Sequence, residues 1–257
     1  MQYKNLIPLL LFLSILVSCT KDNTEIFFES IHKSENDFGC TSGCPEINIQ
    51  QLEAISPTDK MEPIAENINR TISEHIIYSL SSYEDEDTSE SIEEAVKEFI
   101  SRYKEDKREF PDMVAHYTAT IESDKIHDSE NLISIRMFTH LYTGGAHGYS
   151  SVSYLNFDPK TGNEIAIEQM LIDTEDFINF VEIKFRRAYD IPEGSDLNAT
   201  RFMFEGNAFI LPSSMGFDYK HMLFTYNPYE IAPYSEGLIE LKIPINEVQA
   251  FLKLNLE

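Results

Sequence analysis

The sequence predicts an α+β fold, with mixed and largely antiparallel sheets, packed helices and two sequential subdomains. Three observations predict it. Apolar residues recur with the period of a helix near residues 64–80, 91–103 and 177–188, and β-rich runs stand between and after them. Helices and strands do not alternate regularly, as they would in a parallel βαβ fold. A hydrophobic share of 42% in 257 residues suffices for a buried core and argues against disorder.

Capping residues help to place the helices. Pro63 fits the first turn of the first helix. Ser91 fits the N-cap of the second helix, with Glu94 as its capping-box partner three residues on. Asp173 or Thr174 caps the third helix. A last short helix is predicted near residues 246–252.

The strands are predicted from β-rich runs and the turns that separate them. A polar turn at 123–131 lies between two such runs, which favours their antiparallel pairing. Residues 158–162 contain proline and glycine at positions typical of a turn. The predicted strands are 46–50, 116–121, 132–139, 151–157, 202–204, 208–211, 221–226 and 238–243.

The N-terminus indicates the compartment. An apolar run follows Lys4, and it is shorter than the roughly 20 residues that a membrane span needs. Its length, and the small residue Ser18 before Cys19, are typical of a lipoprotein signal peptide at 1–18 with lipidation at Cys19. The alternative is a short anchor that is not cleaved. Residues 19–45 are polar and are predicted to be a tether that ends in a first strand.

The anchor places the protein in the cell envelope, on the outer membrane. Residues 20–22 partly resemble the surface-export signal of Bacteroidetes lipoproteins, but Asn23 replaces its second acid. The periplasmic and the surface face therefore both stay open. Outside the cytoplasm, Cys40 and Cys44 are predicted to form a local disulfide. A zinc site is the alternative, but only His32 lies near enough in sequence to add a ligand.

Charge excludes one class of function. The chain has 44 acidic and 20 basic residues and a formal net charge of -24, which would repel nucleic acid. An acidic surface favours cationic partners. The acidic cluster at 84–94 is either part of such a surface or a solvated loop.

Three segments carry a family resemblance: YTGGAHG at 142–148, YLNFDPKTG at 154–162 and NPYEIAPYSEG at 227–237. Together they resemble the RsiV-like C-terminal domain, which is found in lysozyme-sensing anti-sigma factors and in many envelope proteins. The part before it resembles the companion domain that precedes the catalytic domain of PdaC-type peptidoglycan deacetylases. We therefore expect a PdaC/RsiV-like domain at 46–140 and an RsiV-like domain at 141–257. The resemblance implies a recognition module outside the cytoplasm, and lysozyme binding by some members makes lysozyme a candidate partner.

Candidate ligand-binding residues lie within these segments. Gly144 and Gly145 allow a sharp turn that presents His147, with Tyr142 beside it. The alternative is that the glycines only set a strand crossover and that His147 bonds a backbone carbonyl. His140 adds a second imidazole, but its spacing from His147 is not that of a metal site.

A tyrosine-proline stretch supplies the other candidates. Tyr229 and Tyr234, with Tyr226, suit either an aromatic surface for sugar rings or proteins, or the core. Enzyme motifs such as G-x-S-x-G, H-E-x-x-H and the P-loop are absent from the sequence. We expect a non-catalytic envelope lipoprotein without metal or cofactor, which binds a cationic, lysozyme-like protein or a peptidoglycan-related ligand. The alternative is a cell-wall glycan hydrolase or a deacetylase-type enzyme that uses His147.

Overall fold

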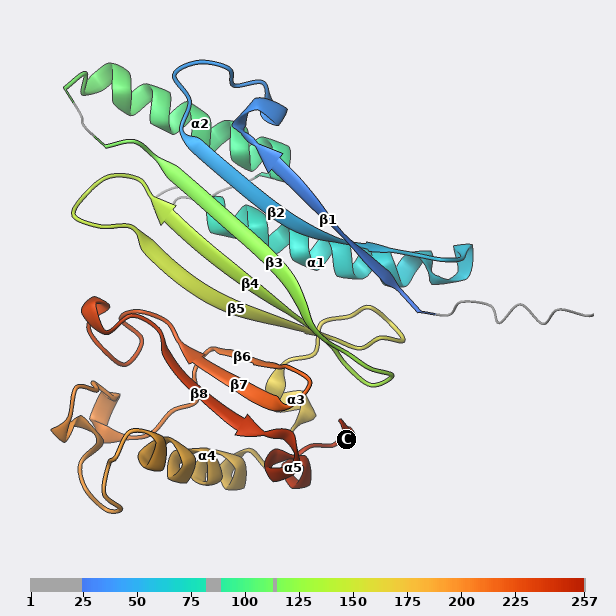
Figure 1. Ribbon diagram of the computed structural model, residues 1–257, viewed down its shortest axis with the longest axis vertical. Helices are drawn as coiled ribbons and strands as arrows, with labels where there is room; N and C mark the ends of the chain where they lie inside the picture. The colour runs from blue at the N-terminus through green and yellow to red at the C-terminus, as the bar shows by residue number, and fades with distance from the viewer. Residues whose placement is uncertain (1–24, 82–88, 113–114, 257) are drawn as a thin grey trace, which may run out of the picture.

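A five-stranded sheet and a three-stranded sheet follow each other along the chain, each with its own helices (Figure 1). The protein is described by a computed structural model, which covers residues 25–81, 89–112 and 115–256. The α+β prediction is confirmed. The first sheet has the order β1-β2-β3-β4-β5, in which only β2 and β3 are parallel. Its strands are β1 Phe27–Ser34, β2 Glu46–Ile55, β3 Thr118–Asp128, β4 Ile133–Tyr142 and β5 Tyr149–Phe157.

Two long helices cover one face of the first sheet. They are α1, Glu62–Leu80, and α2, Ile92–Glu109. Their apolar faces, including Ile72 and Phe99, pack with alternate strand residues such as Ile121 into the first core. Pro63 lies in the first turn of α1, and the Ser91 hydroxyl accepts the Glu94 N–H at 3.2 Å, as the sequence predicts. The Glu94 carboxylate accepts the Glu90 N–H at 2.9 Å, one residue before the Ser91 N–H that a capping box would bond.

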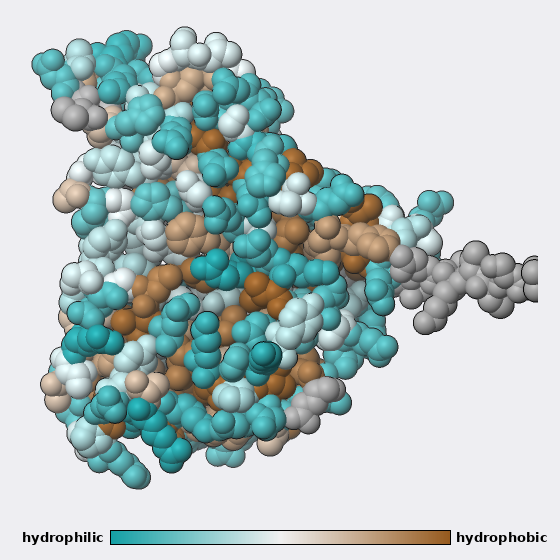
Figure 2. Space-filling view, viewed as in Figure 1, coloured by the Kyte–Doolittle hydropathy of each residue, from teal (hydrophilic) through white to brown (hydrophobic). Residues whose placement is uncertain are grey.

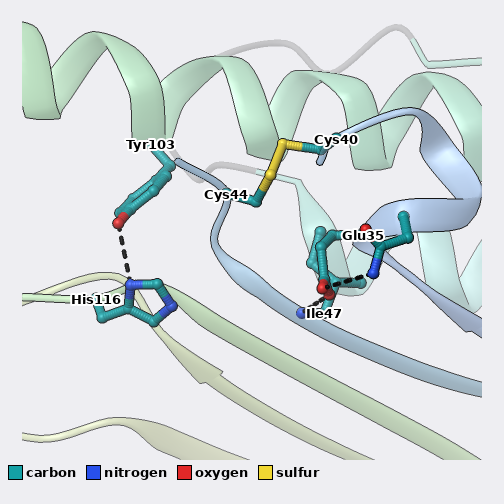
Figure 3. Close-up of a disulfide and its surroundings, with 7 residues drawn as sticks. Glu35, Cys40, Cys44, Ile47, Tyr103 and His116 are labelled. Carbon is teal, nitrogen blue, oxygen red and sulfur yellow. Dashed lines mark hydrogen bonds between the residues drawn. A yellow bond between two sulfur atoms is a disulfide. The ribbon is translucent and has the colours of Figure 1, made fainter. Parts of the chain in front are cut away.

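Part of the segment that the sequence assigned to a tether is structured. Residues 27–34 form β1, which pairs with residues 48–55 of β2, and η1 (Glu35–Phe38) follows. Cys40 and Cys44 are joined by a disulfide next to α2 (Figure 3). Glu35 ties this loop to β2, because its carboxylate accepts the Ile47 N–H at 3.2 Å. β1 is exposed or partly exposed along its whole length and has little apolar pattern, so its pairing with β2 had no strong local signal.

The second subdomain pairs a small sheet with one main helix. The antiparallel strands are β6 Ser214–Phe217, β7 His221–Tyr226 and β8 Ile239–Pro244. The helices are α3 Ile167–Met170, α4 Thr174–Ala188 and α5 Ile245–Val248, and Asp173 caps α4. Short 3-10 turns complete it: η3 Leu197–Ala199, η4 Glu205–Asn207, η5 Tyr234–Glu236 and η6 Gln249–Phe251, while η2 (Asp59–Met61) precedes α1.

The predicted strands at 202–204 and 208–211 are wrong. Phe202 and Phe204 are buried against Phe185 of α4, with ring centroids 5.0 and 5.6 Å from it. The Asn198 side chain accepts the Phe204 N–H at 2.7 Å and donates to the Phe204 carbonyl at 2.8 Å. The Asn198 side chain therefore bonds the backbone groups of Phe204 that a neighbouring strand would otherwise bond. The Phe202 and Phe204 rings can then turn into the core without a strand.

The second subdomain docks on the sheet face opposite α1 and α2. Ser134 and Asn156 lie on this face and alternate with core residues of β4 and β5. The Ser134 hydroxyl donates to the Asn156 amide oxygen at 2.8 Å, and the Asn156 amide donates to the Met215 carbonyl at 2.9 Å. The first sheet extends to Phe157, so the two sheets divide after β5, whereas the sequence placed the boundary at 140, inside β4.

Candidate functional site

The turn between β4 and β5 presents His147. Gly144 and Gly145 have φ of 104° and 84°, which glycine adopts without strain. The Tyr142 hydroxyl donates to the Gly145 carbonyl at 3.2 Å and braces the turn. At Gly148 the chain passes so close to β4 that a Cβ atom would lie 2.7 Å from His140 Cε1. Gly144 and Gly145 therefore close a hairpin between the neighbouring strands β4 and β5. From the sequence, a strand crossover was the alternative.

A second turn, between β7 and β8, presents Tyr229. The Glu230 N–H donates to the Asn227 carbonyl at 3.0 Å, which closes a β-turn with Pro228 and Tyr229 at its centre. Tyr229 has a φ of 72°, at the turn position where a type II turn favours glycine. The Glu230 carboxylate fixes the turn by accepting the N–H groups of Asn227 and Ser213, both at 2.8 Å.

The two turns meet in one aromatic cluster, which we call the ledge: His147, Tyr229 and Tyr234. Both turns lie on the left side of Figure 1. The His147 and Tyr234 rings stack with centroids 3.7 Å apart and 14° between their planes. The Tyr229 and Tyr234 centroids are 5.7 Å apart. Residues more than 80 positions apart in sequence are thus brought together, and each subdomain contributes to the ledge.

Hydrogen bonds indicate which tautomer His147 adopts in the ledge. His147 Nδ1 lies 3.0 Å from the Gly148 carbonyl, which can only accept, so Nδ1 carries a proton. In the neutral imidazole, Nε2 then accepts from the Tyr229 hydroxyl at 3.4 Å. The Tyr234 hydroxyl donates to the same Gly148 carbonyl at 2.6 Å. Both ring nitrogens and one ring face of His147 are therefore in use, and the partners of the two nitrogens are a carbonyl and a hydroxyl.

Exposure separates the three tyrosines that the sequence grouped. Tyr229 is 59% exposed and Tyr234 is partly exposed, whereas Tyr226 is 1% exposed. The Tyr226 hydroxyl donates to the Ile210 carbonyl, and burial raises the pKa of its phenol. Tyr226 thus belongs to the second core, and only Tyr229 and Tyr234 take part in the ledge.

Asn227, which the sequence reading did not single out, holds the ledge in place. Its amide oxygen accepts the Val152 N–H at 2.8 Å, and its amide donates to the Val152 carbonyl at 3.1 Å. These two bonds tie the β7–β8 turn to β5 in the other subdomain. The available signal was its position before Pro228 in a turn, but nothing local indicates its partner 75 residues away.

The other predicted sites are placed as follows. Cys19, the signal peptide at 1–18 and the acidic residues at 84–87 lie outside the described residues. Cys40 and Cys44 bond each other, and His140 bonds the Ser150 hydroxyl at 2.8 Å. In the described part of the chain, no three His, Cys, Asp or Glu side chains gather in a way that could hold a metal ion. Across the same ranges, no helix combines the length and the apolar character needed to cross a membrane.

Comparisons with known proteins identify the two domain types. Residues 41–150 match the family model described as "Deacetylase PdaC", and residues 172–246 match "Protein of unknown function (DUF3298)". The chain is therefore similar to these two families in this order along the sequence. No curated protein matches the chain in sequence.

Solved structures share the fold. A DUF3298 family member from Bacteroides fragilis superposes with a TM-score of 0.68 at 21% identity, over 91% of this chain and 96% of that one. A DUF3298 family protein from Pseudomonas aeruginosa superposes with a TM-score of 0.62 at 20% identity, over 91% and 97%. At these identities the likeness establishes a common fold for both domains together.

Proposed function

We propose that the protein is a non-catalytic recognition protein of the cell envelope, anchored to the outer membrane through a lipid on Cys19. Its ligand is either a peptidoglycan-related molecule or a cationic protein, such as lysozyme, that acts on the cell wall. The ledge is the binding surface. The lipoprotein-type N-terminus, the acidic charge and the RsiV-like resemblance support this proposal, and incorporation of labelled palmitate at Cys19 tests the anchor.

The conformation of Tyr229 carries the proposal. A tyrosine in the left-handed region costs about 1–2 kcal/mol relative to a glycine at that position. Its ring is mostly exposed, so burial recovers little of this cost. Exposed tyrosine held rigidly by neighbours is typical of binding surfaces, because it offers contact area at little entropic cost. A binding role explains why a strained position presents an aromatic ring.

The arrangement of His147 supports recognition over the alternative of a hydrolase or deacetylase. A general base needs a nitrogen that can reach the substrate, usually with a carboxylate that orients the ring. Both nitrogens of His147 have partners: the Gly148 carbonyl at Nδ1 and the Tyr229 hydroxyl at Nε2. His147 therefore acts as a rigid support for the two tyrosines.

The test is a pair of glycine variants. Tyr229→Gly removes the ring and relieves the strained φ, so binding should weaken at least tenfold while the free energy of unfolding does not fall. Asp190→Gly is the matched control, because Asp190 also has a positive φ of 54° and is exposed after α4. Binding of the full chain to purified sacculi and to lysozyme is measured at low and high salt, with sugar release from the sacculi as the readout for catalysis.

Each outcome decides between the readings. Loss of binding in Tyr229→Gly but not in Asp190→Gly supports the ledge. The proposal would be refuted if Tyr229→Gly and Asp190→Gly bound equally well. It would also be refuted if the wild type bound neither sacculi nor lysozyme at low salt. Release of sugars by the wild type, but not by His147→Ala, would establish the enzymatic alternative instead.

A further inference from the structure

A polar surface lies beside the ledge, on the sheet face opposite α1 and α2. We call it the strip: Asn48 and Gln50 of β2, Thr120 and Glu122 of β3, and Phe138 and His140 of β4. Asn48 is exposed and the others are partly exposed. On the other face, their neighbours Ile49, Ile121 and Met137 are buried in the first core. The second subdomain packs farther along this face, on β4 and β5.

Strand register aligns the strip in rows across the sheet. Asn48 lies beside Thr120, Thr120 beside His140, and His140 beside Ser150 of β5. Neighbouring strands are about 4.8 Å apart, so this row of four residues spans about 14 Å. That length fits a chain of several sugar rings and is too long for a single one.

The strip is continuous with the ledge. His140 donates to or accepts from the Ser150 hydroxyl at 2.8 Å, and Gly148 packs directly on the His140 ring. The Gly148 carbonyl in turn accepts bonds from both His147 and Tyr234. One end of the row therefore reaches the backbone that supports the stacked rings.

The chemistry of the strip favours an uncharged, polyhydroxylated ligand. Its amides, hydroxyl, imidazole and carboxylate are directional donors and acceptors, and Phe138 adds one apolar surface among them. At its border, Arg136 lies opposite Asp124 and 5.9 Å from the Phe138 ring. The strip and its border carry two acids, Glu122 and Asp124, and one base, Arg136, so charge is a minor part of a surface made mostly of neutral polar groups.

We propose that the strip is the floor of an oligosaccharide-binding site, with the ledge as the stacking platform for a sugar ring at one end. This inference rests on the proposed role of the ledge and specifies its ligand as a glycan chain. Rings stack on Tyr229 and Tyr234, while the hydroxyls of further rings bond the polar side chains of β2 to β4. Affinity should therefore rise with chain length.

The experiment measures binding of N-acetylglucosamine oligomers of two and five residues to the full chain by calorimetry. The wild type should bind the pentamer at least tenfold more tightly than the dimer. Gln50→Ala combined with Thr120→Val should weaken pentamer binding several-fold and leave the dimer unchanged, whereas Tyr229→Gly should weaken both. Glu98→Gln, on the exposed side of α2, is the control and should change neither.

The outcomes separate this inference from the proposed function. If the strip variant binds the pentamer like the wild type while Tyr229→Gly does not, the ledge stands and the strip is refuted. If the wild type binds lysozyme through the ledge but neither oligomer, the glycan inference fails and protein recognition remains. If the wild type binds neither sugar, sacculi nor lysozyme, both proposals fall.

Discussion

At the scale of single residues, His127 shows how burial couples the two subdomains to pH. It is 3% exposed at the end of β3 that contacts the β6–β7 turn. Its Nδ1 lies 3.2 Å from the Asp218 carbonyl, and its Nε2 lies 3.1 Å from the Ser129 hydroxyl. Desolvation lowers the pKa of His127, although the bond to Asp218 and the nearby carboxylates of Asp128 and Asp218 partly oppose this. The tilted Tyr219 ring, 5.2 Å away, covers the imidazole.

Acidification should therefore destabilise the protein through His127. As the pH falls, the imidazole of the unfolded chain takes up a proton near pH 6.5, whereas the buried imidazole of the folded protein does so only at a lower pH. Burial of neutral His127 therefore costs no stability above pH 6.5, and the free energy of unfolding declines as the pH falls below it. Urea unfolding at pH 7.5 and pH 5.0 measures the effect. The loss of stability between the two values should be smaller in His127→Gln than in the wild type. The exposed His32→Gln is the control, and an equal loss in all three proteins would contradict the prediction.

At the scale of elements, α2 depends on its first turn. The helix follows a segment of acidic sequence, and the Ser91 hydroxyl accepts the Glu94 N–H, one of the groups that the first helical turn leaves without a partner. The Glu94 carboxylate accepts the Glu90 N–H just before the helix. α2 in turn packs Phe99 and Tyr103 into the first core and lies beside the Cys40–Cys44 loop. The ring of Tyr103 also contacts Tyr117 at the entry to β3, with centroids 5.2 Å apart. The cap therefore supports one wall of the first subdomain.

Removing the cap should destabilise the protein measurably. Ser91→Ala should lower the free energy of unfolding by about 1 kcal/mol, the usual cost of losing an N-cap side chain. Ser101→Ala, at an exposed position inside α2, should change it by less than about 0.5 kcal/mol. Urea midpoints of the two variants give the comparison. Similar effects at both positions would show that the cap makes no specific contribution.

At the scale of the whole molecule, the interface between the sheets determines whether the ledge exists. On the face shown in Figure 2, hydrophobic residues reach the surface over both subdomains, with the broadest patches in the lower half. Polar bonds help to hold the two bodies together, such as the one between the Tyr154 and Thr225 hydroxyls at 3.1 Å. Gly216 of β6 packs on the Tyr154 ring, where a Cβ atom would lie 2.5 Å from Cγ.

A methyl group at Gly216 should force the subdomains apart. Gly216→Ala should cost about 1–3 kcal/mol, as overpacking of a tight contact does. Hydrogen exchange should become faster in β5 and β6, while α1 keeps its protection. Ligand binding at the ledge should weaken with it, because His147 and Tyr229 come from different subdomains. Ser213→Ala, exposed next to β6, is the control, and unchanged exchange in Gly216→Ala would rule out this role of the contact.

The sequence predicted what depends on neighbouring residues. The helical periods around Ile72, Phe99 and Val181, and the caps Ser91 and Asp173, place the long helices correctly. Cys40 and Cys44 were paired because they are close in sequence. These features depend on hydrogen bonds and apolar faces that span only a few residues, so a local pattern is sufficient to reveal them.

Tertiary structure decided what depends on distant partners. The sequence named His147, Tyr229 and Tyr234 as candidates, but only the docking of two sheets stacks them. It also grouped Tyr226 with them, although that ring is buried. Phe204 looked like part of a strand because the bonds from Asn198 have no sequence signature. By itself the sequence determined which segments fold and which residues have suitable chemistry. Where those residues meet was fixed by contacts across dozens of intervening residues, since packing, unlike helix or strand periodicity, leaves no repeating pattern along the chain.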